Sequence, residues 1–326
     1  MADLTLAVAT LLEDWAKGVT NVFGTRNEFF RHYRYMDKKN PSGRRGYRVV
    51  EGGRLFVETL ATAVNSTFRG YDDRETIDTT ESEEVKEAQY SQRIIAGSIN
   101  VSKLQEAQNM PAYQIHDLLE TKFEIAESSM EEILGDSALS DGTTDTKLPG
   151  GLQLIIGTTA GTVGTISEAA NPVTWAPYRD ATGVTAWNTA NEGMIALDLG
   201  MNNCKRGQEK PDLIVTTNAV SSLINVMTIV AGTLNVNMGS ERGELGFDDV
   251  FYRKARVIVD DNVPVNRLYL VNTRHLRFAV LRKGEFKTTK MKEPIGGLYS
   301  VAQMYVFCNF TCSDRRLQGV LTGITG

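Results

Sequence analysis

The sequence predicts an α+β protein, and three observations support this prediction. Residues 53–101 alternate apolar and polar side chains weakly around a charged turn, a pattern typical of a long two-stranded ribbon. Residues 111–139 carry apolar side chains at helical spacing, and residues 299–312 alternate as one long strand does. A lone two-stranded ribbon is at best marginally stable in water, so we expect another copy of the chain to cover this arm.

The arm divides into three parts. We predict an outgoing strand at residues 53–68, a charged tip at 69–76 and a returning strand at 84–101. Nothing else in the sequence indicates a partner for this arm within its own chain. An arm of this kind is more typical of an assembling protein than of a self-contained enzyme.

One very long helix follows the arm. Pro111 suits a first helical turn, because its missing N–H needs no partner there. Gly135 is a candidate C-cap, although the pattern can also continue to Leu139. Up to Leu134 the helix would be about 36 Å long, which suits a structural support better than a reactive site. Its predicted apolar stripe is Ile115, Leu118, Leu119, Phe123, Ala126, Met130, Ile133 and Leu134.

The remaining chain predicts loops and then an α/β segment. Residues 135–185 are rich in Gly, Thr, Ser and Asp, and we expect loops there with one short strand at 152–156. A helix is expected from Asn218, which can act as its N-cap. The other predicted elements are a helix at 186–202 and strands at 211–216, 256–260, 268–272, 276–282, 299–312 and 315–324.

Composition excludes several classes of protein. The chain has 326 residues, 41% apolar and 23% charged, as an ordinary folded protein does. Its net charge of −5 argues against a general nucleic-acid binder. No apolar run reaches the ~18 residues of a membrane span, and the first residues lack the basic region of a signal peptide. Three cysteines, an odd number, indicate a reducing compartment.

Charge is distributed unevenly between two neighbouring segments. Residues 31–48 hold seven basic residues against one acidic residue, whereas residues 69–87 hold eight acidic against three basic. Opposite patches of this kind suit head-to-tail contact between copies, and two unrelated solvated faces are the alternative. Tyrosines among the arginines of residues 31–48 also suit nucleic acid. The predicted contact residues are Arg69, Tyr71, Asp72, Asp73, Arg74 and Glu75, and Arg44, Arg45 and Arg48.

A search for chemistry identifies no catalytic, cofactor or metal site. The glycines of residues 157–164 lack the Gly-Lys-Ser/Thr of a phosphate loop and indicate a turn. The three histidines, His32, His116 and His275, are not spaced as metal ligands. The pair Asp260 and Asp261 precedes Asn262-Val263-Pro264, which is ordinary turn chemistry.

The order of these parts resembles the major capsid proteins of tailed bacteriophages, whose Hong Kong-type coat fold encapsulins share. Three runs within residues 211–286 carry most of the resemblance: Pro-Asp-Leu-Ile-Val-Thr-Thr from Pro211, Gly-Phe-Asp-Asp-Val-Phe-Tyr from Gly246, and Leu-Tyr-Leu-Val-Asn from Leu268. The resemblance extends over nearly the whole chain, but no short motif defines it.

The resemblance implies a division into four parts. These are an N-terminal arm at 1–52, an extended loop at 53–99, a peripheral domain at 100–184 and 273–326 with a spine helix at 111–139, and an axial domain at 185–272. The loop at 232–246 would lie near the centre of each ring of subunits. The residues expected there are Asn235, Asn237, Ser240, Glu241 and Arg242.

The function implied by the resemblance is that of a coat protein. Pentamers and hexamers would form an icosahedral shell around double-stranded DNA, assembled in the host cytoplasm and found in the virion, without catalysis, cofactor or membrane. No lysine lies between Lys39 and Lys86, so we expect non-covalent contacts at the tip. The short segment before the basic stretch leads us to expect a separate scaffolding protein, a portal and possible decoration proteins. Residues 31–48 would meet packaged DNA non-specifically at the inner surface.

Three alternatives remain at this point. An encapsulin-like compartment has the same fold with enzyme cargo in place of a genome. A hydrolase built on residues 186–290 would need a nucleophile–base pair, which the scattered histidines do not indicate. A tail or baseplate component would form tubes or small rings in place of closed shells.

Overall fold

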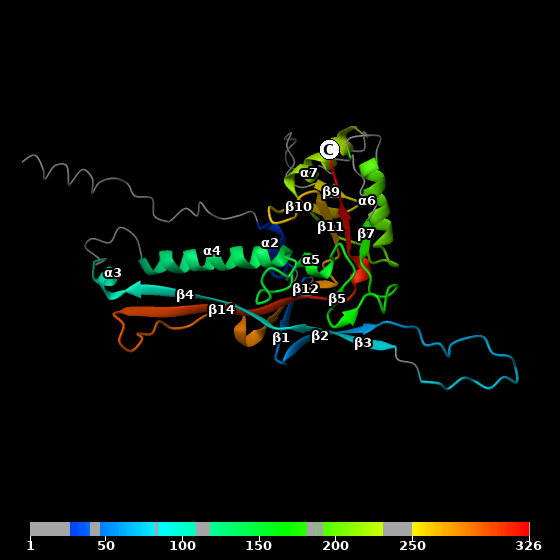
Figure 1. Cartoon of the computed structure of the whole chain (residues 1–326), viewed down its shortest axis with the longest axis horizontal. Helices are drawn as coiled ribbons and strands as arrows, with labels where there is room; N and C mark the ends of the chain where they lie inside the picture. Colours follow the sequence, from blue (N-terminus) through cyan, green and yellow to red (C-terminus); the bar gives the residue numbers. More distant parts are fainter. Residues whose placement is uncertain are drawn as a thin grey trace, which may run out of the picture. The chain divides into compact units, whose positions relative to one another are not determined.

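The computed structural model describes residues 27–39, 46–81, 84–108, 118–180, 187, 192–230 and 250–325 (Figure 1). The chain divides into two compact units. Among the described residues, unit 1 comprises 96–108, 118–132 and Phe286–Tyr305, and unit 2 comprises the rest. Each unit is described by itself below. The four-part division inferred from the resemblance stays a prediction.

A six-stranded sheet forms one part of unit 2. Its strand order is β7 (Tyr178–Asp180), β15 (Gly319–Thr322), β11 (Arg267–Val271), β8 (Leu213–Thr216), β10 (Ala255–Val259) and β9 (Val250–Tyr252). Strand β8 is buried along its whole length and runs parallel to β10, as the predicted α/β segment requires. The predicted strands at 211–216, 256–260 and 268–272 are therefore confirmed.

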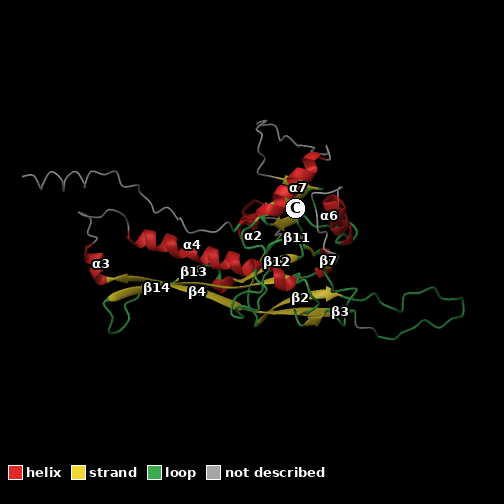
Figure 2. Cartoon of the chain, turned by 45° about the horizontal axis from the view of Figure 1, so that its top comes forward, coloured by secondary structure: helices red, strands yellow, loops and turns green. Residues whose placement is uncertain are grey.

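Helices α6 (Glu192–Asn203) and α7 (Asn218–Val230) cover one face of this sheet (Figure 2). Leu197 of α6 and Ile224 of α7 form one apolar core with Ile214, Leu268 and Leu270 of the strands. Burial of such side chains supplies the main favourable free energy of folding. The predicted helix beginning at Asn218 is confirmed. Over the described part of the chain, no helix combines the length and apolarity that crossing a bilayer requires.

A second sheet is built around β14 (Tyr299–Cys312), which has the full 14-residue length predicted from its alternation. In unit 2, β12 (Leu276–Leu281) pairs with residues 308–312 of β14, and β1 (Tyr47–Val50) pairs with β12. In unit 1, β13 (Lys287–Thr288) pairs with residues 304 and 305 at the edge of the sheet. Strand β4 (Arg93–Ser102) also pairs with β14.

Helix α2 (Glu28–Lys39) supplies aromatic side chains to the core of unit 2. Phe29 and Tyr33 contact Phe310 of β14, with ring centroids 6.3 and 6.2 Å apart, and Phe30 meets Phe278 of β12 edge-on at 5.4 Å. Phe29, Phe30 and Tyr33 are almost completely buried. Aromatic pairs in these geometries add to the free energy gained by burial alone.

Helix α4 (Leu118–Leu139) forms the predicted long helix, and the residues before Leu118 that were assigned to it lie outside the described residues. Met130, Leu134 and Ala138 are buried at a spacing of four residues, whereas Ile133 is partly exposed. Gly135 does not end the helix. A Cβ at Gly135 would lie 2.3 Å from the side chain of Asn27, so this glycine allows close packing inside the helix.

One predicted strand is wrong, and another, at 315–324, is shorter than predicted because residues 315–317 form a 3₁₀ helix. Residues 152–156 contain a helical turn, α5 (Leu152–Ile155), in place of a strand. Leu152, Ile155 and Ile156 are all buried, and their spacing of three and four residues fits a helical turn better than alternation. A short apolar run by itself does not distinguish a buried strand from a buried helix. The small elements that complete the fold are α3 (Lys103–Gln108), β5 (Thr162–Val163), β6 (Ile166–Ser167), η1 (Arg282–Gly284) and η2 (Arg315–Leu317).

The predicted arm is a ribbon of β2 (Leu55–Ala61) and β3 (Val85–Ser91), paired from Leu55 opposite Ser91 to Ala61 opposite Val85. Figure 2 shows these strands continuing into a loop that extends beyond them. The outgoing strand is shorter than predicted, since residues 62–68 form no strand, and the predicted returning strand is divided at Gln92 into β3 and β4. We call β2 and β3 the root of the arm and residues 62–81 its tip.

Candidate functional site

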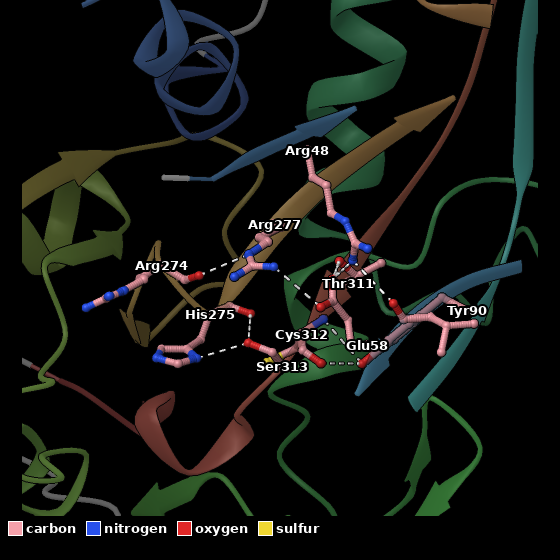
Figure 3. A network of polar contacts seen from close by, with 10 residues as sticks. Arg48, Glu58, Tyr90, Arg274, His275, Arg277, Thr311, Cys312 and Ser313 are labelled. Atoms are coloured by element: carbon pink, nitrogen blue, oxygen red, sulfur yellow. Dashed lines mark hydrogen bonds and ion pairs between the residues drawn. The ribbon is translucent and has the colours of Figure 1, made fainter. Parts of the chain in front are cut away.

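The root is held by a buried carboxylate, that of Glu58 on β2, which is 6% exposed. Its oxygens accept hydrogen bonds from Arg48 of β1 and from the Thr311 hydroxyl of β14 at 3.0 Å, and Arg277 of β12 lies 3.4 Å away (Figure 3). Hydrogen bonds to an ionised group are stronger than neutral ones. Glu58 therefore joins the arm to three strands of the second sheet.

Strand β3 is fixed to the other elements of unit 2 by separate contacts. The Tyr90 hydroxyl donates to the backbone oxygen of Cys312 at 2.9 Å and accepts from its N–H at 3.2 Å, and burial raises the pKa of Tyr90 well above its usual value. Gln89 N–H donates to Gly164 O in the β5–β6 turn, and Lys86 Nζ donates to Asn171 Oδ1 at 2.8 Å. The expectation that the arm lacks cover within its own chain is therefore wrong for the root.

The root has one buried face because its residues alternate. Phe56, Leu60 and Ala88 lie on the covered face with Glu58 and Tyr90, and all are buried. In the register Phe56 lies opposite Tyr90 and Glu58 lies opposite Ala88, so these residues form cross-strand pairs on the same face. The period of two in the sequence thus matches the side of the ribbon that packs on the rest of unit 2.

The tip is ordered by its own polar contacts. Arg69 pairs with Glu75 at 2.9 Å and lies 5.0 Å above the Tyr71 ring, while Glu75 also accepts from the N–H of Asp72. The Tyr71 hydroxyl donates to Thr67 O at 2.7 Å and accepts from the N–H of Asp78. The structure thus brings together four of the predicted contact residues. Asp73 and Arg74 lie on the same turn and are exposed.

The tip combines negative charge with exposed apolar side chains. Val64, Phe68 and Ile77 are 89%, 85% and 66% exposed, respectively. Two hydrogen bonds from Thr80 lower the pKa of Asp78, which keeps that carboxyl ionised. Exposed apolar groups rimmed by charge mark surfaces that bind a partner.

Of Arg44, Arg45 and Arg48, the basic residues predicted to meet the tip, only Arg48 lies among the described residues. Arg48 is paired with Glu58 in the root, so its guanidinium is already engaged inside its own chain. Arg44 and Arg45 lie outside the described residues, as do all five residues predicted for the capsomer centre: Asn235, Asn237, Ser240, Glu241 and Arg242.

Sequence reasoning missed a second basic surface, on unit 1. Lys287, Lys290 and Lys292 are exposed along β13 and the residues after it, and we call them the lysine edge. Beyond them in the same unit, Ile295, Leu298 and Leu104 expose 108%, 83% and 65% of their surface, and Lys103 N–H donates to Leu298 O. The signal was present as Lys-Thr-Thr-Lys-Met-Lys, but a short lysine run commonly only protects an edge strand.

A serine–histidine contact also occurs in unit 2, which the search for chemistry did not find. His275 Nδ1 lies 2.9 Å from the Ser313 hydroxyl, and Ser313 N–H donates to His275 O at 2.9 Å (Figure 3). Burial lowers the pKa of His275. Among the described residues no carboxylate bonds the other ring nitrogen to complete a triad. The contact joins the start of β12 to the end of β14.

Comparison with known proteins places the fold. The cyanophage A-1(L) capsid protein superposes with a TM-score of 0.69 at 17% identity, over 99% of both chains. The SrpI encapsulin of Synechococcus elongatus PCC 7942 has a TM-score of 0.61 at 10% identity, over 98% of this chain and 95% of that one.

A third comparison, with the capsid protein of the myovirus XM1, gives a TM-score of 0.58 at 11% identity, over 97% of this chain and 98% of that one. No family model and no curated protein matches the sequence. At these identities the likeness lies in the path of the backbone and covers both units. The chain therefore has the Hong Kong-type coat fold, which tailed-phage capsid proteins and encapsulins share.

Proposed function

We propose that this chain is the major coat protein of a tailed phage, which assembles as pentamers and hexamers into an icosahedral shell around double-stranded DNA, without catalysis. The observation that carries the proposal is the match over 99% of both chains to the subunit of a cyanophage capsid. Because almost no segment of either chain is left unmatched, the likeness supports the same function for this chain, that of a shell subunit. The protein then belongs to the virion, with itself as its first partner.

The distribution of exposed apolar groups supports the same proposal. Phe68 in the tip and Leu298 in unit 1 are each more than four-fifths exposed. Monomeric soluble proteins rarely expose large contiguous apolar patches, and where such patches occur they mark surfaces that bind a partner. In a closed shell such groups are covered, and many weak contacts add up.

The acidic tip of one subunit pairs, in this proposal, with a basic surface of its neighbour. Since Arg48 is engaged by Glu58, the candidates are Arg44 and Arg45 and the lysine edge. The lysine edge is supported by the apolar side chains beside it, which match Val64, Phe68 and Ile77 of the tip in kind. Opposite charges would set the register of the contact, and apolar burial would supply affinity.

Further partners follow from the same proposal. A separate scaffolding protein, a portal and possible decoration proteins complete the assembly, and packaged DNA meets the basic segment 31–48 non-specifically through its phosphates. The loop at 232–246, with Asn235, Asn237, Ser240, Glu241 and Arg242, surrounds the centre of each capsomer.

Electron microscopy of the purified chain, alone and co-expressed with its genomic neighbours, tests the function. Closed icosahedral particles are expected, and nucleic acid inside them distinguishes a genome container from an encapsulin, which would hold protein cargo. Monomers or dimers under both conditions would overturn the proposal. Tubes or small rings would point to a tail or baseplate component.

Charge reversal tests the contact. Lysine at Asp72 and Asp73 (D72K, D73K) should block assembly, glutamate at all three positions of the lysine edge should do the same, and the combined variant should restore shells. Glu124→Lys on the exposed face of α4 serves as the control. Raising salt should also weaken the wild-type contact, because exposed charges are screened. Unchanged assembly when either surface alone is reversed would exclude this pairing, but it would not contradict the proposed coat function.

A further inference from the structure

Helix α2 is capped by a residue from a distant part of the chain. The N–H of Phe29 in its first turn donates to Asp260 Oδ2 at 3.0 Å, and the N–H of Asn262 donates to the other carboxylate oxygen at 3.0 Å. Asp260 follows β10 and is 1% exposed. Its carboxylate therefore satisfies a helix-terminal N–H that α2 leaves without a partner within the helix.

The same junction joins α2 to the end of α4. The Asn262 side-chain amide donates to Asn27 Oδ1 and to Asp136 Oδ1, both at 2.7 Å. Gly135 gives Asn27 the room it occupies, since a Cβ there would lie 2.3 Å from the asparagine side chain. Three segments far apart in sequence thus meet at the first turn of α2, through which the chain enters unit 2.

The carboxylate of Asp260 is buried without a cation. Among the described residues no lysine or arginine forms an ion pair with it, and the two charged groups that act on it, Glu28 and Asp261, are also acidic. Asp136, on the far side of Asn262, is acidic as well. Burial raises the pKa of Asp260 to about 6, against the opposing effect of the two N–H donors.

We propose that Asp260 and the first turn of α2 form a proton-operated latch, in which α2 docks more firmly when the carboxyl is protonated than when it is ionised. If α2 separates, Asp260 becomes solvated and its pKa falls toward its usual value. The docked state then binds the proton more tightly, so protonation favours docking. The stabilisation is complete in acid and is lost as the pH rises through about 6.

A second titrating group on α2 acts in the opposite direction. Burial and the neighbouring Arg256 lower the pKa of His32, although Asp212 and Glu28 oppose the shift. Protonation of His32 therefore weakens the docking of α2 as the pH falls below the ordinary pKa of histidine. The contribution of Asp260 must be measured as a difference between variants, with His32 held constant.

Hydrogen exchange of the full-length protein tests the latch. Amides of residues 29–33 are followed at pH 5 and pH 8 in a His32→Asn background, with and without Asp260→Asn, and corrected for intrinsic exchange. With Asp260 present, opening of α2 should be about tenfold rarer at pH 5 than at pH 8. The reason is that the opening equilibrium constant falls about tenfold for each pH unit below the pKa of the docked carboxyl. With asparagine the ratio should be close to one.

Asp261→Asn is the matched control, because it removes an adjacent charge and leaves the cap intact. It should reduce the pH dependence only slightly. Equal pH dependence with and without Asp260→Asn would overturn the proposal. If the asparagine variant does not fold, titration of the Asp260 carboxyl by carbon-13 NMR in the wild-type chain decides it. A midpoint near 6 supports the latch, and one at or below 4 overturns it. Neither result depends on the proposed coat function.

Discussion

The root and the tip belong to one arm, but the root is buried against its own unit and the tip is exposed. At the root, Glu58 and Tyr90 are buried and bonded to β12 and β14, whereas Phe68 at the tip is 85% exposed. Both parts are rich in polar contacts, yet the contacts of the tip stay within residues 62–84 of the arm itself. Substitutions at the root should therefore change the stability of the subunit, and those at the tip should change association.

Glu58→Gln should have the largest effect on stability. It removes the charge that balances Arg48 and Arg277, and breaking a largely buried ion pair costs about 3 kcal/mol. Thermal or denaturant unfolding of the unassembled subunit measures this loss. Glu87→Gln, on the exposed face of β3, is the control and should change little. An equal loss in the two variants would contradict the assigned role of Glu58.

Gly164→Ala should come next. This glycine has a φ of +61°, and an added Cβ would lie 2.9 Å from Ala88 and 3.0 Å from the Tyr90 ring. Backbone strain and overpacking together should cost about 2 kcal/mol of unfolding free energy. Gly161→Ala is the matched control, because nothing lies within 4 Å of its Cβ position. A neutral Gly164→Ala would show that the β5–β6 turn does not support the root.

Two tyrosines allow a direct comparison of root and tip. Each hydroxyl donates one hydrogen bond and accepts another, Tyr90 in the core and Tyr71 in the tip. Tyr90→Phe leaves the buried N–H and C=O of Cys312 without this partner and should cost about 1.5 kcal/mol. Tyr71→Phe should cost below about 0.5 kcal/mol, since water can replace the hydroxyl there. Similar losses in both, measured by unfolding, would contradict the distinction.

Phe68→Ser should have the smallest effect on the subunit. Its ring contributes little to the core, so the unfolding free energy should change by less than about 0.5 kcal/mol. Shell yield, measured by sedimentation, should nevertheless fall, because the proposed contact loses an apolar group. Val173→Ser, at an 80% exposed position outside the arm, is the control. Full shell yield with Phe68→Ser would remove this residue from the contact.

Periodic patterns predicted most of the secondary structure. The apolar residues Ala302, Val306 and Phe310 fall on alternate positions of β14, and all three are buried as expected. Residues 213–216 form a buried strand because the apolar run there is short and is followed at once by a helix start. Local patterns of this type survive folding because tertiary packing uses the same faces.

Long-range contacts could not be predicted in the same way. Glu58 looks like an ordinary exposed position in an alternating strand, and nothing near it in the sequence indicates Arg277 or Thr311, both more than 200 residues away. Gly135 resembled a C-cap because the asparagine that requires it, Asn27, belongs to another part of the chain. The lysine run can be read in the sequence, but only the structure shows that these lysines lie exposed along β13 and the residues after it.

Strand β14 changes character along its length. From Tyr299 to Tyr305 only Ala302 is buried, whereas from Cys308 to Cys312 every residue is buried on both faces. Most positions of the first part can therefore vary, with Ala302 as the exception, whereas every position from Cys308 to Cys312 is constrained. Among related chains, sequence variation should be high up to about Tyr305, except at Ala302, and should nearly disappear from Cys308 onward. The two parts of this one 14-residue strand would then diverge at different rates among related chains.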